Sequence, residues 1–161
     1  MTGMSIPQFC SSEALDLNRS PIRVPARFYD VPFNFDRYPG AAGVSGFTGG
    51  ANCQLYAYEF LREHGYSISD LRSSNLWEDT EYTYEVALPQ AFDIAMVHER
   101  PEAWGAHVML CVGNNLFLHL SSRIGRPAVE SLDEVMARPY YQYLIGFKRC
   151  HSRRPISGLD E

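Results

Sequence analysis

Apolar residues recur at helical spacing in one segment of the chain and at strand spacing in several later ones. Residues 52–64 (NCQLYAYEFLREH) carry Leu55, Tyr56 and Phe60 on one face, which is the spacing of a buried helix side. Asn52 can accept a hydrogen bond from the first turn, and the glycine that follows residue 64 can end the helix. We therefore predict a helix over residues 52–64.

Four later segments have the length and composition of β-strands. They cover residues 92–98, 107–112, 116–121 and 141–148. Residues 131–137 (SLDEVMA) predict a short helix, and residues 70–79 predict a helical turn followed by an irregular stretch up to Pro89. A helix followed by an antiparallel meander predicts a two-layer α+β fold, with the first helix packed on the sheet.

The placement of prolines suggests how the 161 residues are organised, within the length of one domain. The first forty residues contain Pro7, Pro21, Pro25, Pro32 and Pro39. Proline fixes φ and lacks a backbone donor, so we predict that residues 1–36 form an irregular arm whose aromatic side chains pack against the body. Residues 37–149 then form the main domain, and residues 150–161 form a polar tail.

Composition excludes several classes of protein. The net charge is −5 with only one lysine, Lys148, which argues against a nucleic-acid partner. The first twelve residues lack a signal-peptide pattern, and no apolar run reaches the roughly 18–20 residues that cross a bilayer. We therefore expect a cytoplasmic protein without a membrane span. The four cysteines are too few for a disulfide scaffold and form no C-x-x-C motif.

Cys53 lies at the predicted start of the helix, directly after the glycine-rich residues 40–50. Free N–H groups and the positive end of the helix dipole lower the pKa of a thiol at that position. The thiolate is the nucleophile of cysteine enzymes, and the same N–H groups can stabilise an oxyanion. Position alone leaves two interpretations open, a catalytic nucleophile or a small buried residue of the helix.

His107 and His119 lie on neighbouring strands, so the register of their hairpin decides whether they meet. Opposed residues of an antiparallel pair point to the same face. A three-residue loop over residues 113–115 places Met109 opposite His119 and puts both histidines on one face, whereas a two-residue loop over residues 113–114 separates them. The other face is wholly aliphatic and belongs to the core, and we expect the helix of Cys53 to cover the histidine face.

Each histidine has a structural interpretation as a core residue that makes one hydrogen bond. Two of them on one face, opposite a capped cysteine, favour catalysis instead. Cys53, His107 and His119 could also hold zinc, but their spacing matches no compact zinc motif. We therefore predict no metal and no cofactor.

These residues together resemble a known family. Tyr38 and the glycine-rich loop, then GGANCQLYAYEFLREHGYSI, then WGAHVMLCVGNNLFLHLSS, resemble the NlpC/P60 family of cysteine peptidases. The order is the family's: a cysteine at a helix start, a histidine that opens a strand, and a polar residue on the next strand. The resemblance covers about residues 36–148. The family usually has Asp-Cys-Ser-Gly where this chain has Asn52-Cys53-Gln54-Leu55.

The resemblance implies a papain-like fold and hydrolysis of amide bonds in peptidoglycan stem peptides. It implies that Cys53 is the nucleophile, that His107 is the general base and acid, and that His119 orients His107. It also implies that Tyr38, Asn52 and Gln54 support the substrate or the oxyanion. The departure at Gln54-Leu55 keeps two alternatives open, a non-catalytic binding or partner-docking domain on the same fold and an amidase for an amide outside the cell wall.

The implied substrate lies outside the cytoplasm, although the sequence shows no signal peptide. Export by a specialised secretion system as an antibacterial effector would reconcile the two, and an immunity or inhibitor protein would then be an expected partner. Cleavage of imported muropeptide fragments is the other way to reconcile them.

Overall fold

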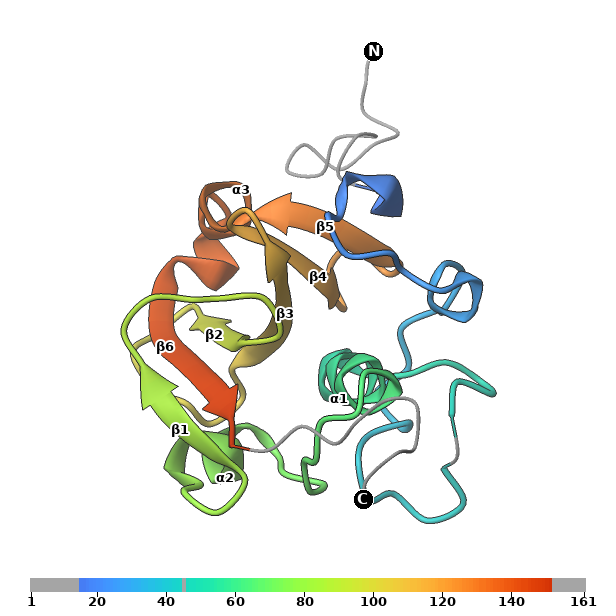
Figure 1. Ribbon diagram of the computed structural model, residues 1–161, viewed down its shortest axis with the longest axis horizontal. Coiled ribbons are helices and arrows are strands. Elements are labelled where there is room, and N and C mark those ends of the chain that lie inside the picture. Colours follow the sequence, from blue (N-terminus) through green and yellow to red (C-terminus); the bar gives the residue numbers. More distant parts are fainter. Residues whose placement is uncertain (1–14, 45, 152–161) are drawn as a thin grey trace.

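An antiparallel sheet forms the centre of the molecule (Figure 1). The computed structural model describes residues 15–44 and 46–151, and within them the sheet has six strands in the order β1-β6-β2-β3-β4-β5. The strands are β1 (Thr83–Val86), β2 (Ile94–His98), β3 (His107–Gly113), β4 (Leu116–Leu120), β5 (Pro127–Ser131) and β6 (Tyr143–Cys150). The helix that bears Cys53 packs against this sheet, so the predicted α+β class is confirmed.

Local sequence signals set the helices. They are α1 (Cys53–Glu63), α2 (Ser73–Glu78) and α3 (Leu132–Met136), with 3-10 turns η1 (Leu17–Arg19), η2 (Ala26–Phe28) and η3 (Pro139–Tyr141). The Asn52 side chain accepts a hydrogen bond from the backbone N–H of Leu55 at 2.9 Å, as predicted for a cap. Ser131 and Glu134 form a reciprocal capping box at the start of α3. The three predicted helical segments are therefore confirmed, each within a few residues.

Two strands were not predicted. β1 lies in the stretch that we expected to be irregular, and β5 begins with Pro127. Both lie at the edges of the sheet, where each pairs with a single neighbour. An edge strand can be short, polar or begin with proline, because only one side of it must donate to a ladder. The sequence pattern of such strands is accordingly weak.

The two faces of the sheet are covered by different elements. α1 packs through Tyr56, Phe60 and Leu61 on the aliphatic face of β3 and β4. The opposite face carries the two histidines, and it is closed by α3 and η3 with their side chains Val135 and Tyr141. Our expectation that α1 covers the histidine face is therefore wrong. The long aromatic stripe of α1 has more apolar area to bury, and the aliphatic face offers the matching surface.

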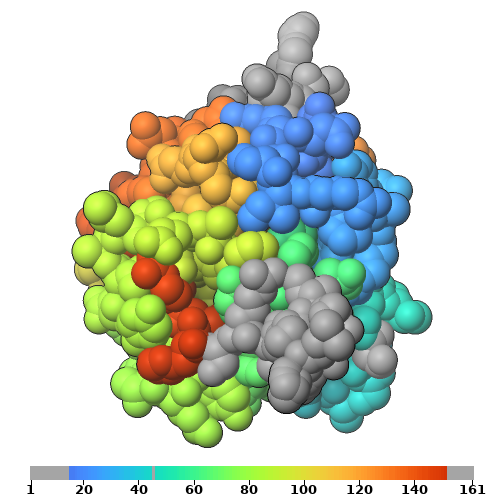
Figure 2. All heavy atoms as spheres, in the orientation of Figure 1, coloured from blue at the N-terminus to red at the C-terminus, as the bar shows by residue number. Residues whose placement is uncertain are grey.

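The described part of the proline-rich arm packs against the body, as predicted. Figure 2 shows it in blue along one side of the molecule, beside β5. The ring of Phe28 is fully buried and meets the rings of Tyr56 and Phe60 edge-on, with centroids 5.5 and 5.2 Å apart. Phe35, by contrast, is 71% exposed. The burial of Phe28 on α1 anchors the arm next to the helix that carries Cys53.

The predicted polar tail overlaps the end of the last strand. Cys150, which we placed at the start of the polar tail, is the last residue of β6 and is buried. Residues 1–14 and 152–161, which hold the rest of the predicted arm and tail, lie outside the described residues. Within the described ranges, none of the helices is long and apolar enough to span a membrane.

Candidate active site

The β3–β4 hairpin brings the two histidines together. His107 Nε2 and His119 Nδ1 are 2.8 Å apart, so the prediction that both share one face is confirmed. The paired positions are Leu110–Leu118, Cys111–Phe117 and Gly113–Leu116. The turn is not the predicted three-residue loop: Asn114 and Asn115 form it, both with positive φ, and an irregularity between Cys111 and Gly113 restores the register.

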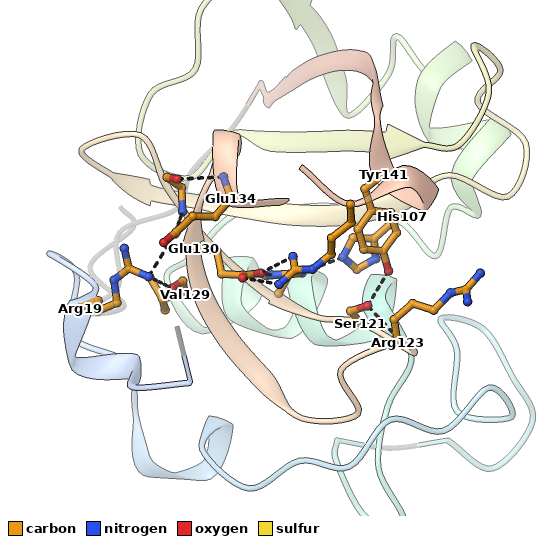
Figure 3. A network of polar contacts seen from close by, with 11 residues as sticks. Arg19, His107, Ser121, Arg123, Val129, Glu130, Glu134 and Tyr141 are labelled. Atoms are coloured by element: carbon orange, nitrogen blue, oxygen red, sulfur yellow. Dashed lines mark hydrogen bonds and ion pairs between the residues drawn. The ribbon is translucent and has the colours of Figure 1, made fainter. Parts of the chain in front are cut away.

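A buried chain of hydrogen bonds continues from the histidines (Figure 3). His119 Nε2 lies 2.8 Å from a carboxylate oxygen of Glu130 on β5. Arg138, between α3 and η3, binds both oxygens of the same carboxylate at 2.9 and 2.6 Å. All four residues are buried, and Arg138 is completely inaccessible to solvent. This chain of hydrogen bonds therefore runs from His107, the first residue of β3, to the buried ion pair of Glu130 and Arg138.

The carboxylate at the end of this chain fixes the proton positions along it. An ionised carboxylate only accepts hydrogen bonds, so His119 must donate from Nε2. With His119 in its neutral form, its Nδ1 carries a lone pair, and His107 donates to it from Nε2. This assignment leaves an unprotonated Nδ1 on neutral His107. Within residues 15–44 and 46–151 that nitrogen accepts no other hydrogen bond.

Tyr141 holds the His107 ring from its face. The two rings stack with centroids 4.6 Å apart and an interplanar angle of 15°. The Tyr141 hydroxyl and the Ser121 hydroxyl are joined by a hydrogen bond, which fixes the tyrosine in turn (Figure 3). His107 is therefore held along one edge by His119 and across one face by Tyr141.

Cys53 and His107 line the same pocket, which has a volume of about 270 Å³. Its other lining residues are Phe33, Phe35, His98, Glu99, Gly105, Ala106, Ser122, Arg123, Tyr140 and Tyr141. In the described part of the chain the thiol and the imidazole share this space without a hydrogen bond to each other. Catalytic pairs often close to bonding distance only when substrate is present. The arrangement can therefore place a carbonyl group between a thiol and a base.

The surroundings favour the neutral forms of both groups. Burial raises the pKa of the Cys53 thiol above its ordinary value of 9.0, against the opposing effect of backbone groups at Val108, Gln54 and Cys53 and of the charge of Arg72. Burial also lowers the pKa of His107 well below 6.5, and the nearby His119 and Arg138 lower it further. Our expectation of a lowered thiol pKa is therefore wrong, because burial at this helix start outweighs the N–H groups.

Glu130 remains ionised. Burial alone would raise the pKa of this carboxyl group, but the hydrogen bonds from His119 and Arg138 more than offset it and lower the pKa to about 2. The negative charge at the end of the chain is thus present at neutral pH. It stands where it can stabilise a positive charge that develops on the histidine pair.

The three predicted supporting residues form a separate cluster at the start of α1. Gln54 is buried and accepts a hydrogen bond from Arg72 Nε at 3.0 Å, and the guanidinium of Arg72 lies 4.3 Å from the ring centre of Tyr38. Asn52 caps the helix. None of the three predicted residues lines the pocket of Cys53 and His107. Their contacts orient the N-terminal turn of the helix.

Four residues of the site were not predicted: Glu130, Arg138, Tyr141 and Arg123. Glu130 carried a usable signal, since a glutamate that follows Val129 in a buried strand must find a buried partner. That signal was lost because β5 itself was not recognised. Arg138, Tyr141 and Arg123 lie in connecting segments, where spacing carries no information about contacts.

The site offers little to a metal ion. Both ring nitrogens of His119 are engaged, one with His107 and one with Glu130. Across the described ranges no three His, Cys, Asp or Glu side chains are grouped so that they could bind a metal. In comparisons with known proteins, no family model and no curated protein matches this chain.

Proposed function

We propose that this chain is a cysteine hydrolase that cleaves an amide bond through an acyl-enzyme. One observation carries the proposal: Cys53 and His107 line one pocket, while Nε2 of His107 is held in the hydrogen-bonded chain of His119 and Glu130. A nucleophile, a base and a group that orients the base are the parts of nucleophilic acyl transfer. The resemblance to NlpC/P60 peptidases and their papain-like fold supports the same class.

Acylation begins when a substrate carbonyl enters the pocket. Nδ1 of His107 takes the proton of the Cys53 thiol, and the sulfur forms a bond to the carbonyl carbon. The carbonyl oxygen becomes an oxyanion beside the free N–H groups of the first turn of α1. The carbon–nitrogen bond then breaks, and the proton on Nδ1 passes to the leaving amine. The product of this half-reaction is a thioester on Cys53 and a free amine.

Deacylation repeats the proton transfers with water. Neutral His107 takes a proton from water as its oxygen attacks the thioester carbon, and the carbon–sulfur bond breaks. The proton on His107 returns to the sulfur, which restores the thiol and releases a carboxylic acid. In both half-reactions His107 becomes positively charged for a time. The ionised Glu130 at the far end of the chain stabilises that charge through His119.

Peptidoglycan stem peptides are the substrate that the family resemblance favours, and export by a specialised secretion system would bring the protein to them. A non-catalytic binding domain on the same fold is the second candidate function. The raised pKa of Cys53 and the absence of a hydrogen bond from its thiol to His107, within the described residues, favour that candidate. The two candidates differ in whether His107 activates the thiol.

Alkylation of Cys53 by iodoacetamide tests this difference. We expect His107→Ala to slow alkylation of Cys53 at least tenfold at pH 7.5, because the base that accepts the thiol proton is lost. Peptide mass mapping assigns the label to Cys53 and separates it from the other cysteines. His151→Ala is the matched control, since His151 is exposed and its side chain contacts, among the described residues, the backbone oxygen of Thr80 and the ring of Tyr84.

Equal alkylation rates in wild type and His107→Ala would contradict the hydrolase proposal and leave the binding domain. The substrate requires a second measurement: digestion of purified sacculi, followed by mass spectrometry of the products. If the muropeptides stay unchanged while Cys53 is reactive and its reactivity depends on His107, the substrate is an amide outside peptidoglycan.

A further inference from the structure

Arg123 brings a positive charge to the pocket of Cys53 and His107. It follows β4, is exposed, and lines that pocket. Its guanidinium lies 4.3 Å from the ring centre of Tyr140, another lining residue. Figure 3 shows its side chain extending away from Ser121 and Tyr141, on the side opposite to Glu130. The charge is therefore part of the pocket and not of the buried chain.

This guanidinium has no carboxylate to neutralise it in the part of the chain that the structure describes. Most other arginines of the sheet region are paired: Arg19 with Glu134, Arg100 with Glu99 and Glu102, Arg138 with Glu130, and Arg149 with Asp93. Arg123 makes a contact with an aromatic face instead, which leaves its N–H donors available. Five unpaired donors in a planar fork are suited to a carboxylate.

The position of Arg123 is tied to the catalytic histidine. The backbone N–H of Arg123 donates to the Ser121 hydroxyl at 3.1 Å, and that hydroxyl also bonds the hydroxyl of Tyr141. Tyr141 in turn stacks on His107. The backbone of Arg123 and the base are thus linked through two side chains. The backbone of Arg123 is therefore held close to His107, and its guanidinium can bind an anion within the same pocket.

The negative charge that lines the pocket already has an ion-pair partner. Glu99 is the acidic residue among the lining side chains, and its carboxylate binds Arg100 at 2.6 Å, while Arg100 also binds Glu102 at 3.3 Å. His98 is also engaged, through its Nδ1, with the backbone oxygen of Glu102. Among the described residues, Arg123 is the charged lining side chain that has no ion-pair partner. The local field around its guanidinium consequently favours an anionic group.

We propose that Arg123 binds a carboxylate of the substrate, so that the pocket accepts amides that carry a negative charge near the scissile bond, such as acidic peptides. The proposal rests on the hydrolase function proposed above. It assigns Arg123 a role in substrate selection and none in the proton transfers. Loss of its charge should weaken the reaction of anionic substrates and leave neutral ones nearly unaffected.

Two alkylating reagents of the same size test this role. Iodoacetyl-glycine carries a carboxylate, and iodoacetyl-glycinamide is its neutral counterpart. We measure the rate at which each labels Cys53 and compare the ratio of rates, anionic over neutral, between variants. Arg123→Gln should lower this ratio about threefold to tenfold, which is the range of a partly exposed charge-assisted contact. Arg123→Lys should retain part of the wild-type ratio.

Arg126→Gln is the matched control, because Arg126 is an exposed arginine of the same loop that does not line this pocket. An unchanged ratio in Arg123→Gln, or an equal fall in Arg126→Gln, overturns the role of Arg123 while the hydrolase function stands. A Cys53 that reacts with neither reagent in the wild type overturns the hydrolase function, and the role of Arg123 with it. Added salt should shrink the difference between the two reagents in the wild type.

Discussion

Glu130 connects the histidine pair to Arg138 in the buried chain of hydrogen bonds. The substitution Glu130→Gln perturbs this hydrogen-bonded chain by replacing one carboxylate oxygen with an NH2 group. The amide has nearly the shape of the carboxylate but no charge. Arg138, which is completely buried, would then lose the carboxylate that binds two of its nitrogens, and His119 would lose a charged acceptor. Removing one partner of a buried ion pair costs about 3–5 kcal/mol of unfolding free energy, because the other charge stays buried and uncompensated.

The pKa of Glu130 gives a second measure of the same effect. It lies at about 2 in the folded chain, against an ordinary value of 4.5. This pKa difference corresponds to stabilisation on the order of 3 kcal/mol. Because the folded pKa is the lower one, the stabilisation is present above pH 4.5 and is lost as the pH falls from there through about 2. Both lines of reasoning predict a loss of about 3 kcal/mol at pH 7 for Glu130→Gln.

Urea denaturation at pH 7, 5 and 3 measures this loss, with tryptophan fluorescence as the signal. The difference between wild type and Glu130→Gln should be largest at pH 7 and should shrink at pH 3. Glu134→Gln is the matched control: its ion pair with Arg19 is partly exposed, and glutamine preserves the capping box, so we expect less than about 1 kcal/mol. Equal losses in the two variants, or a Glu130→Gln difference that persists undiminished at pH 3, would refute the reasoning.

Two further predictions concern the thiol and a packed glycine. Burial raises the pKa of Cys53 above 9.0, and the thiolate fraction levels off only above the pKa. The rate of Cys53 alkylation in His107→Ala should therefore keep rising beyond pH 9, and a plateau below pH 7 would contradict the raised pKa. Gly146→Ala should cost about 2–4 kcal/mol in denaturant titrations, because the added Cβ would clash with the Trp77 ring. Gly125→Ala, with positive φ but nothing within 4 Å, should cost only about 1 kcal/mol, and equal losses would sink the packing explanation.

Sequence could predict the parts of the fold that are set by residues close to one another along the chain. The cap at Asn52 and the capping box at Ser131 lie within a few residues of the helices that they start. The faces of the β3–β4 hairpin follow from alternation, which survived even though the turn proved to be two residues with an irregular strand pairing. The edge strands β1 and β5 lacked such causes, since their pairing depends on neighbours distant in sequence.

The same distinction explains what was missed in the candidate site. Cys53 and His107 could be proposed because each begins an element, and His119 because it shares a hairpin with His107. Arg138 could not, because only the fold brings a residue after α3 against the carboxylate of β5. Which face of the sheet α1 covers depends on how well each face as a whole matches the apolar side of the helix. No single segment of sequence contains that information.

The direction in which the Cys53 pKa shifts shows how burial can outweigh a local sequence signal. A helix start is recognisable from sequence and by itself lowers the pKa of a thiol, but the depth of burial is a property of the fold and here prevails. A neutral thiol beside neutral His107 adds no net charge to the resting site. The charge of Glu130 compensates Arg138 in that state, and in the proposed mechanism it would also stabilise the cation that forms when a proton moves to His107. In that mechanism the buried carboxylate would favour the state that follows proton transfer, which is the property that a base in covalent catalysis requires.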